Sequence, residues 1–328
     1  MNKPMDTLPG EQTRSSEPKA LLRLFGLLVV GAILTYAVMV AIVMTVPDGN
    51  DYALASRIKQ ERLATLEGQR IVLVGGSNLA FGTDSKLLEE LVGCPAVNMG
   101  MNGYFGIEYL LNEAAAGIRP GDLAVLAFEW DNFFKPVDGG APELLVVSKI
   151  NPGSFSYLSW QQKFRVLTEG LAYAARQKSL RLFREGLRSA AMLAGVSLEP
   201  EKRGPLADIE TLAGFTPEGD LVSHLDVTWT NPIEQGLVTD SVDPGVVPLI
   251  TRFTQEMEAR GASVLVSYTP LMRSYYEQHS TILNLAYDRL KAALPGNVPE
   301  PPAAYVYDAN LFFDTVYHLG AEGRELRT

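Results

Sequence analysis

The sequence predicts an α/β domain with a parallel sheet, arranged as a three-layer α/β/α sandwich and preceded by one transmembrane helix. From residue 70 onward, short apolar runs alternate with stretches of helical periodicity, as in strands joined by crossover helices. The first run, Ile71 to Val74, is continuous and rich in β-branched residues, which favours a strand buried on both faces. The stretch from Leu24 to Val46 carries no charge and is long enough to span a bilayer.

Four further apolar runs are expected to be strands: residues 95–99, 123–128, 263–268 and 305–307. Helical patterns separate them, and the first of these places Leu87, Leu88 and Leu91 on one face after a candidate N-cap at Asp84. Strands separated by helices pair in parallel through right-handed crossovers. The alternation fails between residues 131 and 242, where we expect a mostly helical insertion.

Charges on either side of the apolar stretch predict how the chain crosses the membrane. Basic residues precede the stretch and acidic residues follow it: Lys3, Arg14, Lys19 and Arg23 before, Asp48 and Asp51 after. The positive-inside rule therefore places the N-terminus in the cytoplasm and the main domain outside a bacterial inner membrane, periplasmic or extracellular. The expected divisions are a cytoplasmic tail (1–19), a lipid-embedded transmembrane helix (20–47), a stalk (48–69) and the α/β domain (70–328).

The amino-acid composition excludes several classes of function. A formal net charge of −10 argues against a nucleic-acid partner, because phosphates are neutralised by clustered Lys and Arg. Cys94 is the only cysteine, so an intrachain disulfide and a cysteine-based metal site are both excluded. The chain shows no His/carboxylate spacing typical of metal ligands, and we expect neither a metal nor a cofactor.

Candidate chemistry lies at the two ends of the predicted sheet. Ser77 follows the first strand and a Gly75-Gly76 turn, while Asp314 and His318 follow the last strand. Ligands of open α/β sheets bind beyond the carboxyl ends of the strands, so these three side chains are expected to lie at one edge. A histidine can take the serine proton, and a carboxylate can hold the imidazole tautomer and stabilise its cation.

At these residues the sequence resembles the SGNH hydrolase superfamily, also called GDSL-like esterases and lipases. The similar blocks are Gly75-Gly76-Ser77-Asn78, then Asn98, Gly100 and Gly103, and finally Asp314 to Gly323. Three blocks depart from the family pattern. Glycine replaces the aspartate of the first block, and the last block has one more residue between Asp and His. The third block, Gly-x-Asn-Asp, is replaced by Phe128-Glu-Trp-Asp-Asn-Phe133.

The resemblance implies a role for each matching residue. Ser77 would be the nucleophile, His318 the general base and Asp314 its orienting acid. The amides of Ser77 and Gly103 would form an oxyanion hole, with Asn132 or Asn102 as the side-chain donor in place of the missing third block.

Within the superfamily, the chain looks most like a membrane-anchored group that includes the teichoic acid D-alanylation and alginate O-acetylation proteins. This resemblance implies a serine-dependent O-acyltransferase or esterase acting on a cell-surface polysaccharide, beside a multi-pass membrane acyltransferase. The alternative is a non-catalytic scaffold of the same fold in a polysaccharide assembly or acylation complex. A third possibility, a lipase acting on free lipid, is disfavoured by the anchor and by the large insertion.

Three other polar residues could belong to a site. Glu129 and Asp131 flank Trp130 at a strand end and so could face the cleft. A carboxylate pair could indicate a glycosidase, but residues two apart on an extended chain point the same way without a catalytic reason. His224 follows a Gly-Asp turn, and we expect a surface loop there rather than the mouth of a pocket.

Overall fold

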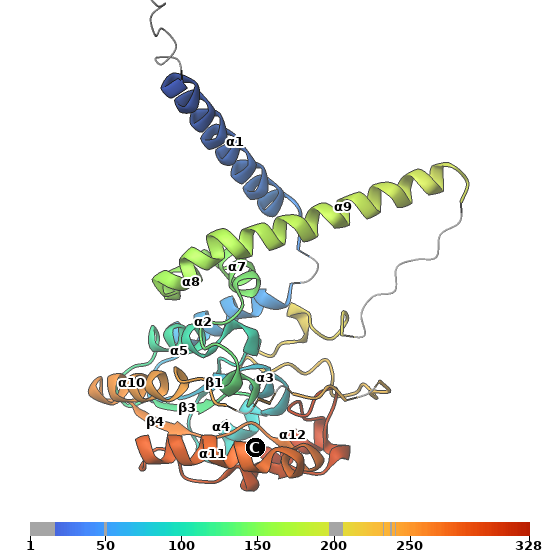
Figure 1. The fold of residues 1–328 in the computed structure, drawn as a ribbon. Helices are drawn as coiled ribbons and strands as arrows, with labels where there is room; N and C mark the ends of the chain where they lie inside the picture. The colour runs from blue at the N-terminus through green and yellow to red at the C-terminus, as the bar shows by residue number, and fades with distance from the viewer. Residues whose placement is uncertain (1–16, 49–50, 197–205, 232, 237, 240) are drawn as a thin grey trace, which may run out of the picture.

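The fold is taken from a computed structural model, which describes residues 17–48, 51–196, 206–231, 233–236, 238–239 and 241–328 (Figure 1). Most of the predicted cytoplasmic tail, residues 1–16, lies outside these ranges. The strands are β1 (Ile71–Gly75), β2 (Ala96–Asn98), β3 (Leu123–Ala127), β4 (Ser263–Val266), β5 (Leu271–Met272) and β6 (Val306–Tyr307).

The α-helices are α1 (Glu17–Thr45), α2 (Ala55–Thr65), α3 (Ser77–Gly82), α4 (Ser85–Val92), α5 (Ile107–Ala115), α6 (Asp131–Phe134), α7 (Ala141–Ile150), α8 (Trp160–Arg165), α9 (Leu171–Leu193), α10 (Val246–Ala259), α11 (Arg273–Ala293) and α12 (Ala321–Arg327). The short helical turns are η1 (Tyr52–Leu54), η2 (Gly103–Phe105), η3 (Pro152–Tyr157), η4 (Val166–Gly170), η5 (Leu212–Gly214), η6 (Pro302–Tyr305) and η7 (Ala309–Leu311). The predicted insertion is helical through α6 to α9, and its described part from residue 206 onward is mostly irregular.

The main sheet has four parallel strands in the order β2-β1-β3-β4. Ile71 in β1 pairs with Ala96 in β2 and with Leu123 in β3, and Leu123 pairs with Ser263 in β4. The prediction of an α/β fold with a parallel sheet is confirmed, and so are the first four predicted strands. The carboxyl ends of these strands meet at one edge, where Ser77 follows β1.

The fifth predicted strand does not join this sheet. The segment 305–307 forms β6, which pairs in parallel with β5 in a separate two-stranded sheet. The outer edge of β4 is occupied instead by Asn297, whose carbonyl accepts from the amide of Val266 at 2.6 Å. The Asn297 side chain also donates to the carbonyl of Val264 at 2.8 Å. Because these groups of β4 are already paired, the last strand finds its partner elsewhere.

Both faces of the main sheet are buried, which explains the continuous apolar run of β1. Val72 and Val74 belong to the large core that includes apolar residues of α5 and α10. Ile71 and Leu73 turn to the opposite face, where they cluster with Leu79 of α3. Figure 1 shows helices above and below the strands.

The predicted stalk is wrong, because residues 52 to 65 are part of the domain. Tyr52 and Leu63 are buried in the main core. Lys59 is only 1% exposed, and its Nζ donates to the carbonyls of Asn98, Gly100 and Gly219 at 2.5 to 3.0 Å. A charged helix with this pattern resembles a solvated stalk in sequence, but here the domain's carbonyls satisfy the buried ammonium.

The stretch Lys19–Thr45 of α1 is long and apolar enough to cross a membrane. It projects away from the domain, and little of it is buried (Figure 1). The exceptions lie in its last turns, which pack against α9. The α/β domain therefore begins within a few residues of the C-terminal end of α1, at Tyr52.

Candidate active site

Ser77 occupies the first position of α3, directly after the turn that ends β1. The turn has no room for a side chain at Gly75, and one at Gly76 would displace the side chain of Glu129. A Cβ on Gly75 would lie 2.0 Å from the carbonyl oxygen of Ala127, and a Cβ on Gly76 would lie 1.7 Å from the carboxylate of Glu129. The Gly-Gly pair thus lets the backbone pass close to β3 and presents Ser77 at the carboxyl edge of the sheet.

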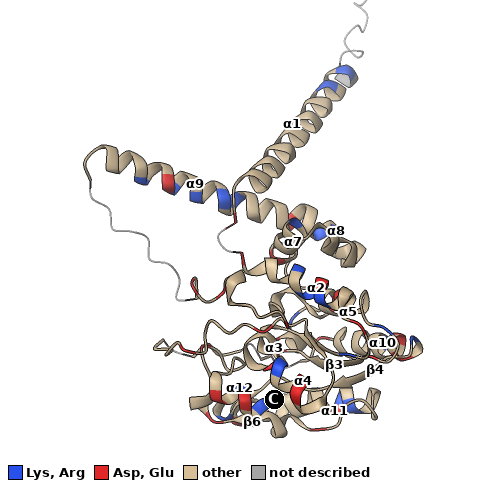
Figure 2. Cartoon of the chain, turned by 180° about the vertical axis from the view of Figure 1, so that it is seen from behind, with Lys and Arg blue, Asp and Glu red and all other residues tan. Residues whose placement is uncertain are grey.

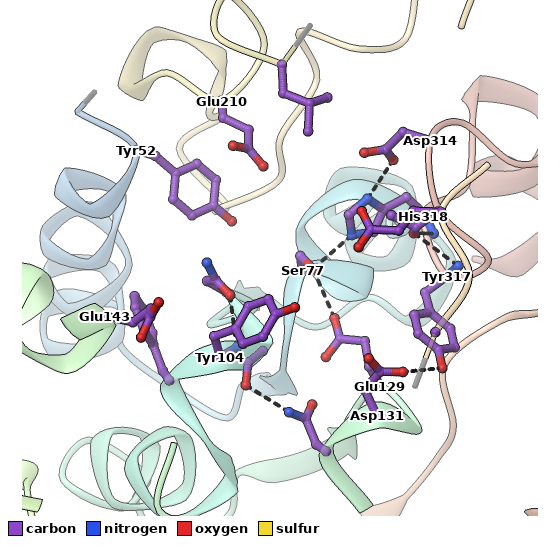
Figure 3. A pocket seen from close by; sticks show the side chains of 18 of the residues that line it. Tyr52, Ser77, Tyr104, Glu129, Asp131, Glu143, Glu210, Asp314, Tyr317 and His318 are labelled. Carbon is purple, nitrogen blue, oxygen red and sulfur yellow. Dashed lines mark hydrogen bonds and ion pairs between the residues drawn. The ribbon is translucent and has the colours of Figure 1, made fainter. Parts of the chain in front are cut away.

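The structure brings Ser77, His318 and Asp314 together, although they come from opposite ends of the domain (Figure 3). Ser77 Oγ lies 2.8 Å from His318 Nε2, and His318 Nδ1 lies 2.7 Å from Asp314 Oδ1. Asp314 is 4% exposed and His318 is 7% exposed. In this geometry the imidazole can take the serine proton through Nε2 while Asp314 holds the opposite nitrogen.

Local packing holds the imidazole in place. The amide of Phe313 donates to the His318 carbonyl at 2.8 Å, which closes the segment between them into a tight loop. This loop folds His318 back onto Asp314, four residues earlier. The ring of Phe81 stacks on the imidazole at 4.0 Å with an angle of 3° between the planes. These contacts stabilise the orientation of the imidazole in which Nε2 faces Ser77 and Nδ1 faces Asp314.

Glu129, which the sequence analysis placed near the cleft without a role, contacts Ser77 directly. Its Oε1 accepts from the amide of Asn78 at 2.7 Å and from Ser77 Oγ at 3.1 Å. The side chain is buried, and Oε2 has no hydrogen-bond partner among the described residues. Figure 3 shows Glu129 and His318 approaching Ser77 from different sides. The signal for this contact was the altered third block, where glutamate directly follows Phe128.

The two predicted oxyanion asparagines both line the pocket, and each supports the loop around Gly103. Asn132 Nδ2 donates to the carbonyl of Gly103 at 2.8 Å. Asn102 Oδ1 accepts from the amide of Tyr104 at 2.9 Å and so caps η2. A Cβ on Gly103 would lie 2.9 Å from Glu129 Oε2, so Glu129 packs directly against this loop.

These residues open onto a pocket of about 320 Å³. Its wall is rich in carboxylates: Glu129, Asp131, Glu143, Glu210, Glu234 and Asp314. Asp131 is partly neutralised, because it accepts from Lys135 Nζ at 2.9 Å and from the Tyr317 hydroxyl at 2.7 Å. Burial raises the pKa of the Glu210 carboxyl. Among the described residues, no group of three or more His, Cys, Asp or Glu side chains is arranged to hold a metal ion.

The expectation that His224 lies on a surface loop is wrong. The side chain is 1% exposed, and its Nε2 lies 3.0 Å from the carbonyl oxygen of Leu319. Phe81 separates it from His318, with ring centroids 4.8 Å from His224. Burial lowers the pKa of His224 to about 4. Its place is therefore behind the site, where it supports the chain just after His318.

No known family, curated protein or solved structure matches this chain.

Proposed function

We propose that this chain is a membrane-anchored, extracytoplasmic O-acyltransferase or esterase that acts on a cell-surface polysaccharide through Ser77. The observation that carries the proposal is the unbroken chain of contacts from Ser77 Oγ through the His318 imidazole to Asp314, at 2.8 and 2.7 Å. A serine, a histidine and a carboxylate in this order are the working parts of acyl transfer.

In the proposed reaction, Ser77 Oγ attacks the acyl carbonyl carbon while His318 Nε2 takes the hydroxyl proton. Asp314 stabilises the imidazolium that results, and the proton then passes to the leaving group. A sugar hydroxyl or water, deprotonated by His318, attacks the acyl-Ser77 ester and restores the serine. The amides of Ser77 and Gly103 are the proposed donors to the developing oxyanion, with Asn132 or Asn102 beside them.

Glu129 and His318 compete for the single hydrogen of the Ser77 hydroxyl in this cycle. The Ser77 hydroxyl carries one hydrogen, and a carboxylate can only accept, so a hydroxyl that donates to Glu129 cannot also donate to His318. Attack therefore requires the hydroxyl to turn toward Nε2. When the hydroxyl donates to Nε2, Glu129 Oε1 keeps its hydrogen bond from the amide of Asn78 at 2.7 Å.

We place the domain in the SGNH-like class of three-layer α/β/α folds. The second block supports this proposal: Asn98 Nδ2 donates to the carbonyl of Leu79, and Asn98 Oδ1 accepts from the amide of Gly100. Asn98 thereby ties the loop after β2 to the helix that begins with Ser77. We further propose a single-pass orientation with the N-terminus in the cytoplasm, supported by the charge asymmetry around α1, and a multi-pass membrane acyltransferase as partner.

One observation favours the non-catalytic alternative. A buried carboxylate directly on the candidate nucleophile opposes the negative charge that acyl transfer develops at the same place. In the scaffold reading, the fold is kept as a partner in a polysaccharide assembly or acylation complex, and the hydroxyl of Ser77 is a structural donor to Glu129.

A serine-directed phosphonate probe separates the two functions. The full-length protein should be labelled on Ser77, as located by mass spectrometry, and Ser77→Ala should abolish the label. Ser156→Ala is the matched control, because this exposed serine donates only to the nearby Gly153 carbonyl and should leave labelling unchanged. If the wild-type protein is not labelled, and cells that carry Ser77→Ala show normal surface acylation, the enzymatic function is excluded. The scaffold function is then the one that remains.

A further inference from the structure

A long helix projects from the domain with many large apolar side chains exposed. Residues 160–193 form one continuous helical rod made of α8, η4 and α9 (Figure 1). Its exposed apolar residues are Trp160, Phe164, Leu167, Tyr173, Leu180, Leu182, Phe183, Leu187, Met192 and Leu193. Trp160 is 81% exposed and Phe183 is 64% exposed, which is unusual for side chains of this size.

Some of the exposed apolar residues of the 160–193 rod form a stripe along α9. Leu180, Phe183 and Leu187 recur at spacings of three and four, so they lie along one side of α9. The basic residues of α9 are Arg176, Lys178, Arg181, Arg184 and Arg188, against the single acid Glu185. Figure 2 shows these positive charges repeated along α9. A basic helix in a chain of net charge −10 suits an anionic surface.

The rod is fixed to the end of α1 that leaves the proposed membrane span. Val43 packs with Leu171 and Ala175 in a small cluster separate from the main core. The hydroxyl of Tyr36 donates to the carbonyl of Leu167 at 3.1 Å, and Lys178 Nζ lies 2.7 Å from a carboxylate oxygen of Asp48. Both views show α9 crossing the C-terminal end of α1, between α1 and the rest of the domain (Figures 1 and 2).

We infer that the 160–193 rod lies in the interface of the bilayer that α1 spans, with its exposed apolar side chains at the acyl boundary and the exposed Arg176 and Arg184 on anionic lipid headgroups. A basic amphipathic helix with exposed aromatic residues binds membranes in this way. The inference rests on the membrane-anchored part of the proposed function, and it does not depend on the chemistry of Ser77.

This arrangement would hold the candidate active site close to the membrane. Leu145 of α7 packs against the cluster formed by α1 and the rod, while Glu143 and Val146 of the same helix line the pocket. One helix, α7, therefore contacts both the rod and the pocket. A rod lying on the bilayer would fix both the height and the orientation of the pocket.

Fluorescence quenching by brominated lipids tests the inference on the full-length protein. The protein, with Cys94→Ser to remove its only cysteine, is placed in nanodiscs that contain phosphatidylglycerol. Phe183→Cys and Leu187→Cys carry a small environment-sensitive label. Glu185→Cys is the matched control on another side of the same helix, and Leu34→Cys in α1 reports insertion of the span.

Brominated acyl chains should quench the labels at residues 183 and 187 about twofold or more, and should quench the label at 185 much less, since an interfacial helix buries only its apolar face. If residue 34 is quenched while 183 and 187 stay as bright as 185, the rod faces water or another protein and the inference fails. If residue 34 is also unquenched, the anchoring itself is wrong and the inference falls with it. Phosphonate labelling of Ser77 in the same discs reports separately on the proposed chemistry.

Discussion

Replacing Glu129 by glutamine should increase, rather than reduce, the reactivity of Ser77. In the resting site the Ser77 hydroxyl lies 3.1 Å from Glu129 Oε1 and 2.8 Å from His318 Nε2, and it can donate to only one of them. Removing a hydrogen bond to a charged group costs about 1.5–3 kcal/mol, whereas a neutral one costs about 0.5–1.5 kcal/mol. Glu129→Gln keeps an acceptor for the Asn78 amide but removes the charge. The barrier to attack should therefore fall by roughly 1.4 kcal/mol, which corresponds to about a tenfold faster reaction.

The assay is the second-order rate of phosphonate labelling together with hydrolysis of an activated ester, both on the full-length protein in detergent. Glu143→Gln is the control, because Glu143 also lines the pocket but lies away from Ser77 (Figure 3). It should change the rate far less than Glu129→Gln does. A rate for Glu129→Gln that is unchanged, or that falls tenfold or more, would refute the idea that the carboxylate competes with His318 for the serine proton. A fall would instead make Glu129 a required part of the machinery.

Three further predictions concern the triad, acid stability and topology. Ser77→Ala and His318→Ala should each abolish ester hydrolysis. The double variant should have nearly the same residual rate as each single variant, because the residues act as one unit. Asp314→Asn should retain more activity, with a loss of up to about 10⁴-fold. Burial lowers the pKa of His224 from 6.5 to about 4, so the unfolded chain binds a proton between these values that the folded chain does not. This contribution to stability is complete above pH 6.5 and is lost as the pH falls toward 4, by up to about 3 kcal/mol. Denaturant unfolding at pH 7 and 4.5 should show a smaller acid loss for His224→Gln, and an equal loss would contradict this reading. A reporter that is active only outside the cytoplasm, fused after Thr328, should be active, and an inactive fusion at normal expression would reverse the proposed orientation.

Features that depend on residues close together in the sequence could be predicted from the sequence alone. The uncharged stretch from Leu24 to Val46 predicted a long apolar helix, because spanning length and lack of charge are local properties. The β-branched run at Ile71 to Val74 and the runs that follow it predicted the four strands of the main sheet. The turn at Gly75 and Gly76 was recognisable for the same reason. The meeting of Ser77 with Asp314 and His318 was expected on the ground that parallel strands end at one edge. The two groups do meet, but β6, the strand before Asp314, lies in the second sheet, so this argument does not account for the contact.

Features that depend on distant partners could not be read in this way. The pattern of residues 305–307 is that of a strand, but Asn297 covers the edge of β4 and sends β6 to a second sheet. The sequence around Lys59 and His224 is typical of surface residues, but both side chains are buried and contact backbone carbonyl oxygens. The contact of Glu129 with Ser77 joins the ends of two neighbouring strands, and the glycine at position 76 makes room for it. In each case the deciding energy is the burial or pairing of a polar group, and its partner lies far away in the chain.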